Sequence, residues 1–189
     1  DEELEKSTIV VFMSDNGTEP GQRKWGSGEP FRGLKWSALE GGTRVPCILR
    51  FPGVISSGEV TDKLTTAIDL LPTLAGACGI KLKEGSGIAP KLDGLNLWAS
   101  LQGKTKTHPR KSLLYWHGWA MPQAIRVGDF KLYLDKVKEI PGTNKGPVLI
   151  DLSKDPREEK DLASEHPEKV KELKEMASKL LSEIGKNSI

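Results

Sequence analysis

The stretch that decides the fold is Ile9-Val10-Val11-Phe12-Met13 followed by Ser14-Asp15-Asn16-Gly17. Its first five residues form a continuous apolar run, which predicts a strand covered on both faces in a parallel sheet. Such a strand would deliver the Asp15 carboxylate and the Asn16 amide at its carboxyl end. Oxygen donors of these kinds suit Ca²⁺ or Mg²⁺ better than zinc. Asn-Gly is also a strong hairpin-turn signal, so the stretch taken alone favours a turn over a metal site.

Two glycine-containing segments follow the strand within thirty residues. Residues 31–36 read Phe-Arg-Gly-Leu-Lys-Trp, and residues 39–46 read Leu-Glu-Gly-Gly-Thr-Arg-Val-Pro. The glycines permit tight turns and close backbone approach, which would present Lys35 and Arg44 from fixed loops. A lysine held in this way is a point charge for an oxyanion such as sulfate or phosphate. Taken singly, each of these charged residues is more typical of a solvated surface.

The order of these motifs resembles the second half of the type I sulfatase family, within the alkaline-phosphatase-like superfamily. The motifs are a strand ending in Ser-Asp-Asn-Gly, then Arg-Gly-x-Lys, then Glu-Gly-Gly-x-Arg-Val-Pro, and the likeness continues at residues 66–74, 93–97, 124–132 and 151–158. Each motif is weak alone, but the ordered set spans nearly the whole chain. The resemblance implies an α/β fold: the C-terminal part of an alkaline-phosphatase-like sulfatase, with a small antiparallel sheet and a C-terminal helix as a subdomain.

The resemblance also implies roles for individual residues. In this family a divalent cation, usually calcium, lies beside a formylglycine made from a Cys or Ser. Asp15 and Asn16 would be metal ligands, and Lys35 would contact the sulfate of the substrate. A cation and a lysine together would stabilise charge on the sulfuryl oxygens as the S–O bond breaks. Glu40 and Arg44 are expected to fix the loop that holds Lys35.

The chain departs from the family in one decisive respect. No Cys or Ser is followed by x-Pro-x-Arg or x-Ala-x-Arg, the pattern that directs formylglycine formation. Two acidic metal ligands and the Lys and His that flank the sulfate in the family are also missing. We therefore expect a fragment of a sulfatase, with the formylglycine in a missing N-terminal half of the catalytic domain. The isolated chain is expected to be inactive.

Two alternatives to a sulfatase fragment stay open. One is a non-catalytic binding or relic module of the same fold. The other is a fragment of a phosphodiesterase or phosphonate hydrolase of the same superfamily, although Lys35 in its Arg-Gly-x-Lys setting favours sulfate. For the sulfatase, the expected ligand is a sulfated small molecule or carbohydrate. The likeness is loosely closest to arylsulfatases and N-acetylgalactosamine-6-sulfatases.

A polar stretch at residues 103–109 divides the chain, so two domains are expected. Residues 1–105 would be the C-terminal part of the catalytic α/β domain, and residues 106–189 would be a subdomain with an antiparallel sheet packed by a helix. In the first part, strands are predicted at 8–13 and 45–51 and a helix at 69–78. In the second, short strands are predicted at 112–116, 123–127, 130–134 and 148–152.

The clearest helix begins at Pro167, which suits a first turn, and is predicted to end at Gly185. An apolar stripe runs along it at helical spacing. Packing onto the chain's own antiparallel sheet explains this stripe better than a partner helix does. The stripe consists of Val170, Leu173, Ala177, Leu180, Leu181 and Ile184.

Residues 115–119, Tyr-Trp-His-Gly-Trp, are the remaining candidate for chemistry. Aromatic rings beside a histidine could line a sugar-binding edge, with His117 and Arg126 as substrate-binding residues. Alternatively, two of the rings sit in the core at strand alternation. His108 and His166 are expected on the surface.

Composition excludes some classes of function. The net charge of +2 is too small to indicate a nucleic-acid partner, and no apolar run approaches the roughly 18 residues of a membrane span. A hydrophobic content of 37% can supply a core. Cys47 and Cys78 are expected to be buried as small hydrophobic residues. A sulfatase parent would be exported, to the periplasm or the extracellular space.

Overall fold

A computed structural model describes the chain except for residues 1, 23, 83–91, 118–120, 136, 138–139, 141–145 and 187–189. Its contacts divide it into two compact units. The first is built mainly from Asp1–Phe12 and Ile48–Lys111, and the second from Met13–Cys47 and Ser112–Lys186. Residues 13–47 thus group with the C-terminal sheet, whereas the domain division expected from the sequence placed them with residues 1–105. Compact units need not coincide with the domains of a longer protein, so that division stays a prediction.

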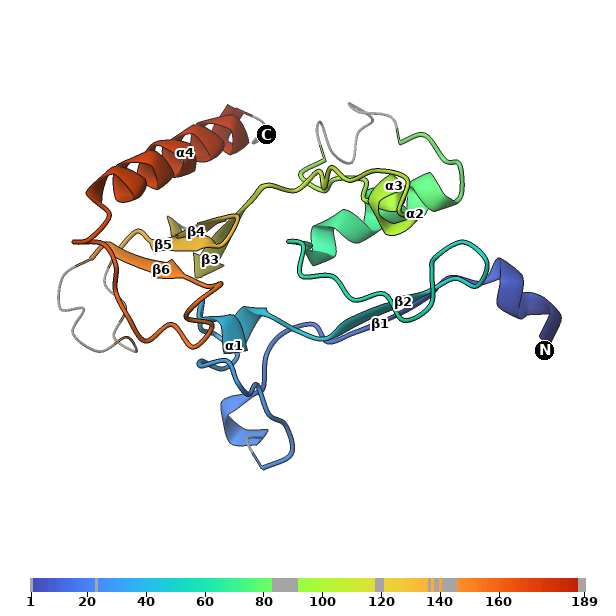
Figure 1. Cartoon of the computed structure of the whole chain (residues 1–189), viewed down its shortest axis with the longest axis horizontal. Coiled ribbons are helices and arrows are strands. Elements are labelled where there is room, and N and C mark those ends of the chain that lie inside the picture. Colours follow the sequence, from blue (N-terminus) through green and yellow to red (C-terminus); the bar gives the residue numbers. More distant parts are fainter. Residues whose placement is uncertain are drawn as a thin grey trace. The chain divides into compact units, whose positions relative to one another are not determined.

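The first unit contains a two-stranded sheet and short helices (Figure 1). The sheet pairs β1 with β2, close to the predicted positions. The apolar run was expected to be covered on both faces, but Val10 is 45% exposed and Phe12 66% exposed. Val10 and Phe12 alternate along β1 with the partly buried Val11 and Met13, so the described residues leave one face of this strand uncovered. The elements are η1 (Glu2–Ser7), β1 (Val10–Met13), β2 (Cys47–Arg50), η3 (Ala67–Asp69), α2 (Leu70–Ala77) and α3 (Trp98–Leu101).

The helix predicted at residues 69–78 is confirmed as η3 followed by α2. The Thr66 backbone N–H donates to Asp69 Oδ2 at 3.1 Å, which satisfies one of the free amides at the start. At the end, Gly79 has a φ of +69°, and the Ile80 N–H reaches back to the Ala75 carbonyl at 2.8 Å. A glycine in this left-handed conformation is a common helix terminator.

The second unit is an antiparallel sheet of order β3-β4-β5-β6, with the four strands near the predicted positions. Val127 pairs with Phe130 across the predicted hairpin turn, where Gly128 has a φ of +57°. A bulge interrupts the β3–β4 pairing between Tyr115 and Trp116. The elements of this unit are η2 (Pro20–Gln22), α1 (Glu40–Thr43), β3 (Ser112–His117), β4 (Met121–Val127), β5 (Phe130–Tyr133), β6 (Val148–Asp151) and α4 (Pro167–Lys186).

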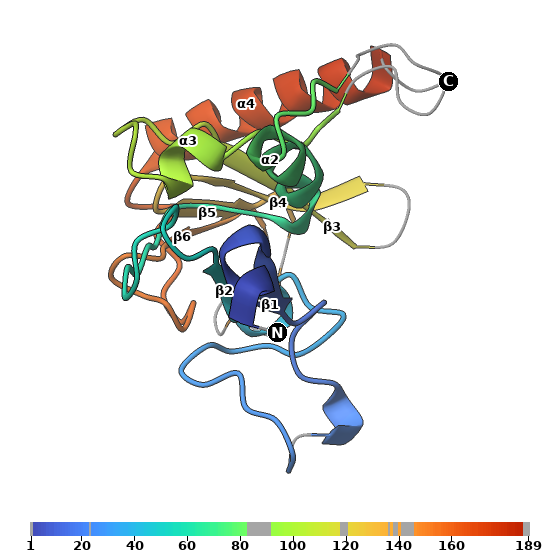
Figure 2. The same cartoon turned by 90° about the vertical axis from the view of Figure 1, so that its right-hand side faces the viewer.

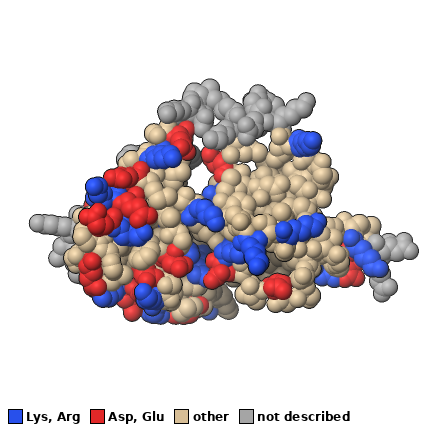
Figure 3. All heavy atoms as spheres, turned by 45° about the horizontal axis from the view of Figure 1, so that its top comes forward, with Lys and Arg blue, Asp and Glu red and all other residues tan. Residues whose placement is uncertain are grey.

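Helix α4 covers one face of this sheet, as its stripe predicts (Figure 2). Leu173 and Ala177 are buried against three strand residues, Ile125, Leu132 and Leu149. Met176, which the stripe omits, also packs here, whereas Ile184 is 36% exposed. The helix continues to Lys186 instead of ending at Gly185. Charged side chains of both signs lie interspersed on the side of the molecule that carries α4 (Figure 3).

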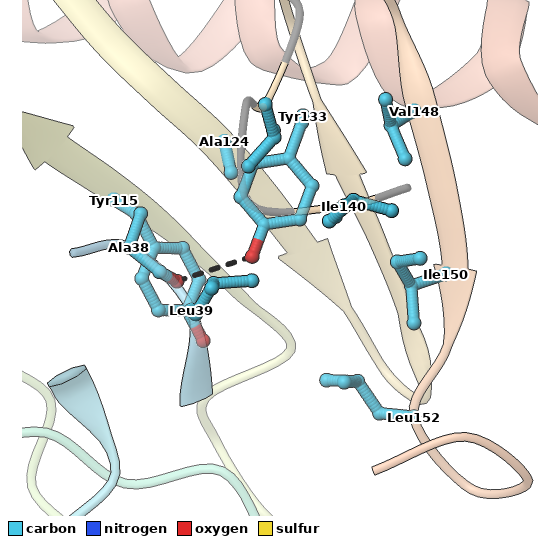
Figure 4. Packing of buried hydrophobic residues seen from close by; sticks show 10 residues of the cluster. Ala38, Leu39, Tyr115, Ala124, Tyr133, Ile140, Val148, Ile150 and Leu152 are labelled. Carbon is cyan, nitrogen blue, oxygen red and sulfur yellow. Dashed lines mark hydrogen bonds between the residues drawn. The ribbon is translucent and has the colours of Figure 1, made fainter. Parts of the chain in front are cut away.

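The opposite face of the sheet is covered by the segment around Ala38 and Leu39 (Figure 4). The Tyr133 hydroxyl lies 3.3 Å from the Ala38 carbonyl oxygen, and Leu39 is only 1% exposed. Residues 38–42 are therefore part of the core of this unit and not a mobile surface loop. No helix among the described residues is long and apolar enough to cross a membrane.

Candidate functional site

Backbone hydrogen bonds join the motif that contains Asp15 to the two glycine-containing segments. The Gly17 N–H donates to the Gly42 carbonyl at 3.0 Å, and the Lys35 N–H donates to the Thr18 carbonyl at 3.0 Å. The Gly41 N–H donates to the Arg32 carbonyl at 2.6 Å. The three motifs that lie apart in the sequence thus form one hydrogen-bonded group of loops.

Glycine is required where these loops cross, because the backbones approach too closely for a side chain. A Cβ atom added to Gly17 would overlap the carbonyl oxygen of Gly41, and one added to Gly42 would overlap the carbonyl oxygen of Ser37. At Gly33, a φ of +90° adds a conformation that favours glycine. We refer to residues 14–18 and 32–43 together as the motif loops.

Asp15 and Asn16, the predicted metal ligands, lie side by side at the end of β1. Asp15 Oδ1 accepts the Asn16 backbone N–H at 2.9 Å, and the Ser14 hydroxyl donates to the Asn16 carbonyl at 3.0 Å. Carboxylate and amide oxygens fit calcium in kind, but calcium takes six to eight oxygens, more than these two side chains can provide. Among the residues that the structure describes, no three His, Cys, Asp or Glu side chains gather to hold a metal. The ligand roles stay a prediction.

Lys35, the predicted sulfate contact, is fixed through its backbone, while its side chain reaches the surface. Its Nζ atom lies 3.0 Å from Glu19 Oε2 and 5.1 Å from the centre of the Trp36 ring. The side chain is 31% exposed. An anion can therefore reach the ammonium group, in competition with the Glu19 carboxylate.

Arg126 and His117, the predicted substrate-binding residues, lie on β4 and β3. The Arg126 side chain is 13% exposed, and its Nη1 atom lies 3.5 Å from Glu40 Oε2. Its Nε–H donates to the Gly128 carbonyl at 3.0 Å. The His117 side chain lies outside the described residues. Of the neighbouring rings, Tyr115 is buried and Trp116 is 45% exposed, so one of them does sit in the core.

A buried cluster of charged side chains was not foreseen in the sequence. Lys131 Nζ lies 2.6 Å from the Ala38 carbonyl oxygen, 2.8 Å from Glu40 Oε1 and 3.0 Å from Glu158 Oε1. The side chains of Lys131 and Glu158 have no exposed area, and that of Glu40 is 2% exposed. We call Glu40, Lys131, Tyr133 and Glu158 the Lys131 cluster. The available signal is a lysine within an otherwise apolar strand, Phe130-Lys131-Leu132-Tyr133.

Two tyrosines complete the surroundings of the Lys131 ammonium group. The Tyr133 hydroxyl donates to Glu158 Oε1 at 2.6 Å, and the Tyr115 ring centre lies 4.5 Å from Lys131 Nζ. Burial and the nearby Glu158 carboxylate raise the pKa of Tyr133, and burial followed by Glu40 raises that of Tyr115. Both phenols therefore stay protonated and serve as neutral partners of the buried charges.

Three further expectations from the sequence need correction. His108 is buried, with its Nε2 atom 2.7 Å from the Leu64 carbonyl oxygen and its Nδ1 atom 3.2 Å from the Ser100 hydroxyl. These two partners lie 44 and 8 residues from His108 in the sequence, so the polarity of its immediate neighbours could not predict its burial. Cys47 and Cys78 are free and exposed, contrary to the expected burial. Partial burial still raises the pKa of the Cys47 thiol.

A second buried ion pair, also missed, lies in the first unit. Arg110 Nε donates to Asp69 Oδ2 at 2.7 Å and Nη2 donates to Asp69 Oδ1 at 2.5 Å. This bidentate geometry is typical of strong arginine–carboxylate pairs. Because Arg110 also donates to the Asp93 carbonyl at 3.0 Å, the pair fastens the start of α2 to residues 93–95.

Comparison with known proteins finds the same family that the ordered motifs resemble. The family profile described as Sulfatase matches residues 1–80. Human steryl-sulfatase is 31% identical over 189 aligned residues, which cover 84% of this chain and 32% of that protein. A solved structure from work on glycosaminoglycan metabolism by Bacteroides thetaiotaomicron superposes with a TM-score of 0.74 at 28% identity, covering 94% of this chain and 39% of that one. Another, described as a complex with its substrate D-glucosamine-2-N,6-O-disulfate, gives a TM-score of 0.65 at 25% identity, with 97% and 36% covered.

The chain spans about a third of the length of the curated relatives it matches. The superpositions confirm the expected α/β fold with an antiparallel sheet and a terminal helix. Family profile, relatives and solved structures agree with one another and with the ordered motifs. The chain therefore belongs to the sulfatase family.

Proposed function

We propose that this chain supplies part of the active site of a sulfuric ester hydrolase that acts on a sulfated carbohydrate or an aryl sulfate. The observation that carries the proposal is the pair of backbone bonds Gly17–Gly42 and Lys35–Thr18, each 3.0 Å long. They tie a segment bearing two oxygen ligands to a segment bearing an accessible lysine. A relative described as bound to a disulfated glucosamine supports the carbohydrate class of substrate.

In this proposal Asp15 and Asn16 contribute two of the oxygen ligands of a calcium ion. When bound, the ion would polarise the sulfate ester and stabilise its developing negative charge. Lys35 would bind a sulfate oxygen, with Glu19 leaving the ammonium group as the anion enters. Because the Lys35 backbone is held by Thr18, the side chain delivers its charge without reordering the loop.

The remaining groups of the site would come from sequence outside these 189 residues. No formylglycine motif occurs in these residues, so in this proposal the nucleophile would come from another segment, the N-terminal half of the catalytic domain. The open apolar face of β1, with Val10 45% and Phe12 66% exposed, supports this assignment because such residues are normally covered. The chain alone would therefore bind ligands weakly and would not turn over substrate.

A non-catalytic binding module is the second candidate. The absent nucleophile motif favours it, and so do the local contacts of two of the predicted site residues: Asp15 accepts the Asn16 backbone N–H, and Lys35 pairs with Glu19. The two candidates differ in what completes the site. The first requires a formylglycine-bearing segment of the same protein, and the second requires none.

Ligand titration of the full chain tests the proposal. Chemical shifts of the motif loops are followed by NMR as sulfate, and separately Ca²⁺, is added. We expect millimolar sulfate to shift the Lys35 region and Lys35→Met to abolish that response, while Asp15→Ala abolishes the response to Ca²⁺. Lys24→Met is the matched control, because Lys24 likewise stacks 5.1 Å from a neighbouring exposed ring, that of Trp25. An equal loss of the sulfate response in both lysine variants would contradict a specific role for Lys35.

Enzymatic assay of the same protein tests its expected inactivity. The chain is incubated with an aryl sulfate and Ca²⁺, and release of the phenol is followed. Turnover above the buffer blank would overturn the claim that the nucleophile lies outside this chain. Restoration of turnover by a separately produced N-terminal sulfatase segment that carries the formylglycine would distinguish the enzyme fragment from a binding module.

A further inference from the structure

We propose that Lys131, with Glu40 and Glu158, is a positioning residue that holds the motif loops in the arrangement described above. The contacts belong to this chain, and the inference rests on the proposed function only in assigning catalytic use to the loops. The ammonium group touches none of the predicted ligands. It would act through residues 38–42, to which both site segments are bonded.

The first argument is that the sheet itself does not require a charge at position 131. Lys131 pairs with Arg126 on β4 and Ile150 on β6, where an apolar residue would pack without the cost of burying an ion. All three N–H bonds of the ammonium group find an acceptor: the Ala38 carbonyl, Glu40 and Glu158. Two of these three acceptors, Ala38 and Glu40, belong to the motif loops, so the buried charge holds the loops and is not needed by the strand.

The second argument is the short path from this charge to the predicted site. Glu158 Oε2 accepts the Glu40 backbone N–H at 2.6 Å, so Lys131 and Glu158 hold both the side chain and the backbone of that residue. Two residues later, the Gly42 carbonyl accepts the Gly17 N–H, next to Asn16. A second branch runs from the Glu158 carbonyl, which accepts Arg32 Nη1 at 3.1 Å, to the segment that carries Lys35.

The third argument is the backbone of Glu158, which has a φ of +57°. A non-glycine residue is rarely found in this left-handed region, where glycine or asparagine costs less. Glutamate is nevertheless present, and its fully buried carboxylate is bonded to Glu40, Lys131 and Tyr133. Unfavourable backbone conformations persist where a side chain is needed in one place. Here that place is beneath residues 38–40.

A merely structural role would stabilise the sheet and the loops equally, and amide hydrogen exchange separates the two cases. In the full chain, the Gly17 and Lys35 amides report on the motif loops. The Leu162 amide, which donates to Leu149 at 2.8 Å, reports on the α4 side of the sheet. For Lys131→Met we expect exchange of Gly17 and Lys35 to rise at least about tenfold relative to that of Leu162, since each depends on one positioned hydrogen bond.

Lys154→Met is the matched control. Lys154 Nζ also lies 3.0 Å from a buried carboxylate, that of Asp151, but its own side chain is 83% exposed. It should leave the ratio of loop to sheet exchange unchanged. If Lys131→Met does not fold, Glu158→Gln keeps the side-chain shape while removing its charge, and Tyr133→Phe removes one donor. Both are expected to raise loop exchange selectively.

Parallel increases in loop and sheet exchange, or no increase in Glu158→Gln and Tyr133→Phe, would overturn the inference. Exchange is measured without calcium or sulfate, so this test can fail while the titrations above succeed. The reverse also holds: loss of loop protection in Lys131→Met would stand even if the chain bound neither ligand.

Discussion

Arg126 and Lys131 lie directly opposite each other on neighbouring strands, and each of these cations contacts a different oxygen of the Glu40 carboxylate. Lys131 Nζ is 2.8 Å from Oε1 and Arg126 Nη1 is 3.5 Å from Oε2. Like charges placed opposite each other in a sheet repel. The negative charge of Glu40 offsets this repulsion, and because Glu40 is the first residue of α1, its carboxylate also links the sheet to α1. The position of Glu40 is therefore set by β4 and β5, although it lies far from them in the sequence.

The first prediction follows from this bridge. Glu40→Ala leaves two cations facing each other, and of the described carboxylates that contact them Glu158 alone remains, beside Lys131. Breaking one side of a buried pair costs about 3–5 kcal/mol, so we expect the free energy of unfolding to fall by about that amount. Urea denaturation measures it. Glu172→Ala is the control, because its partner Lys169 and its own carboxylate lie on the exposed face of α4. A loss below about 1 kcal/mol for Glu40→Ala would contradict the bridge.

The second prediction concerns the packing of α4. Leu173 is 1% exposed against Ile125, Leu132 and Leu149, so Leu173→Ala should lower the free energy of unfolding by about 2–5 kcal/mol. Ile184→Ala, on the same stripe but 36% exposed, should cost much less. Equal effects of the two substitutions in thermal denaturation would mean that the helix does not pack through Leu173.

The apolar stripe of α4 could be predicted from the sequence, whereas the Lys131 cluster could not. Periodicity predicts α4, the four short strands and the hairpin at Gly128 because each depends on residues close in the chain. Lys131 could not be placed in that way, since its acceptor at Ala38 is 93 residues away and a lysine is normally exposed. His108 and Arg110 were missed for the same reason: their partners, Leu64 and Asp69, come from another segment.

The motif loops were foreseen in part. The glycines of residues 33–42 predicted close backbone approach, and the structure shows which carbonyls they approach. Glu40 was expected to fix the loop, and the structure places it in contact with Lys131 and Glu158, which agrees with that role; the role itself stays a prediction. The prediction that β1 is covered on both faces was wrong for this chain, because Val10 and Phe12 are exposed. A run of apolar residues indicates burial, but it does not say whether the elements that cover the strand lie in the same chain.

The third prediction is a pH dependence located at Asp151. Bonds from the Ser153 hydroxyl, at 2.6 Å, and from Lys154 lower the pKa of the Asp151 carboxyl below its usual 3.8. A lowered folded-state pKa contributes stability above the usual value, which is lost as pH falls through the lowered one. The unfolding free energy should therefore decline below about pH 4, and Asp151→Asn should flatten part of that decline. Asp62→Asn, in the first unit, is the control for charge alone, and matching pH profiles of Asp151→Asn and the wild type would count against this assignment.

The last prediction tests the crossing of the motif loops at Gly17. In Gly17→Ala the new methyl group overlaps the Gly41 carbonyl oxygen, so the hydrogen bond from Gly17 to Gly42 must break and residues 14–18 must move. Overpacking of this kind costs about 1–3 kcal/mol and should displace Asp15 and Asn16 together. Gly21→Ala is the matched control, because a Cβ atom there meets nothing within 4 Å. Two-dimensional NMR of both variants checks the expectation: Gly17→Ala should shift the amide signals of residues 14–18 and 40–43 and weaken their response to Ca²⁺. Gly21→Ala should leave both unchanged. If Gly17→Ala retained wild-type shifts in residues 40–43, these two segments would not be in contact, and the loops could not present the predicted ligands and Lys35 as one group.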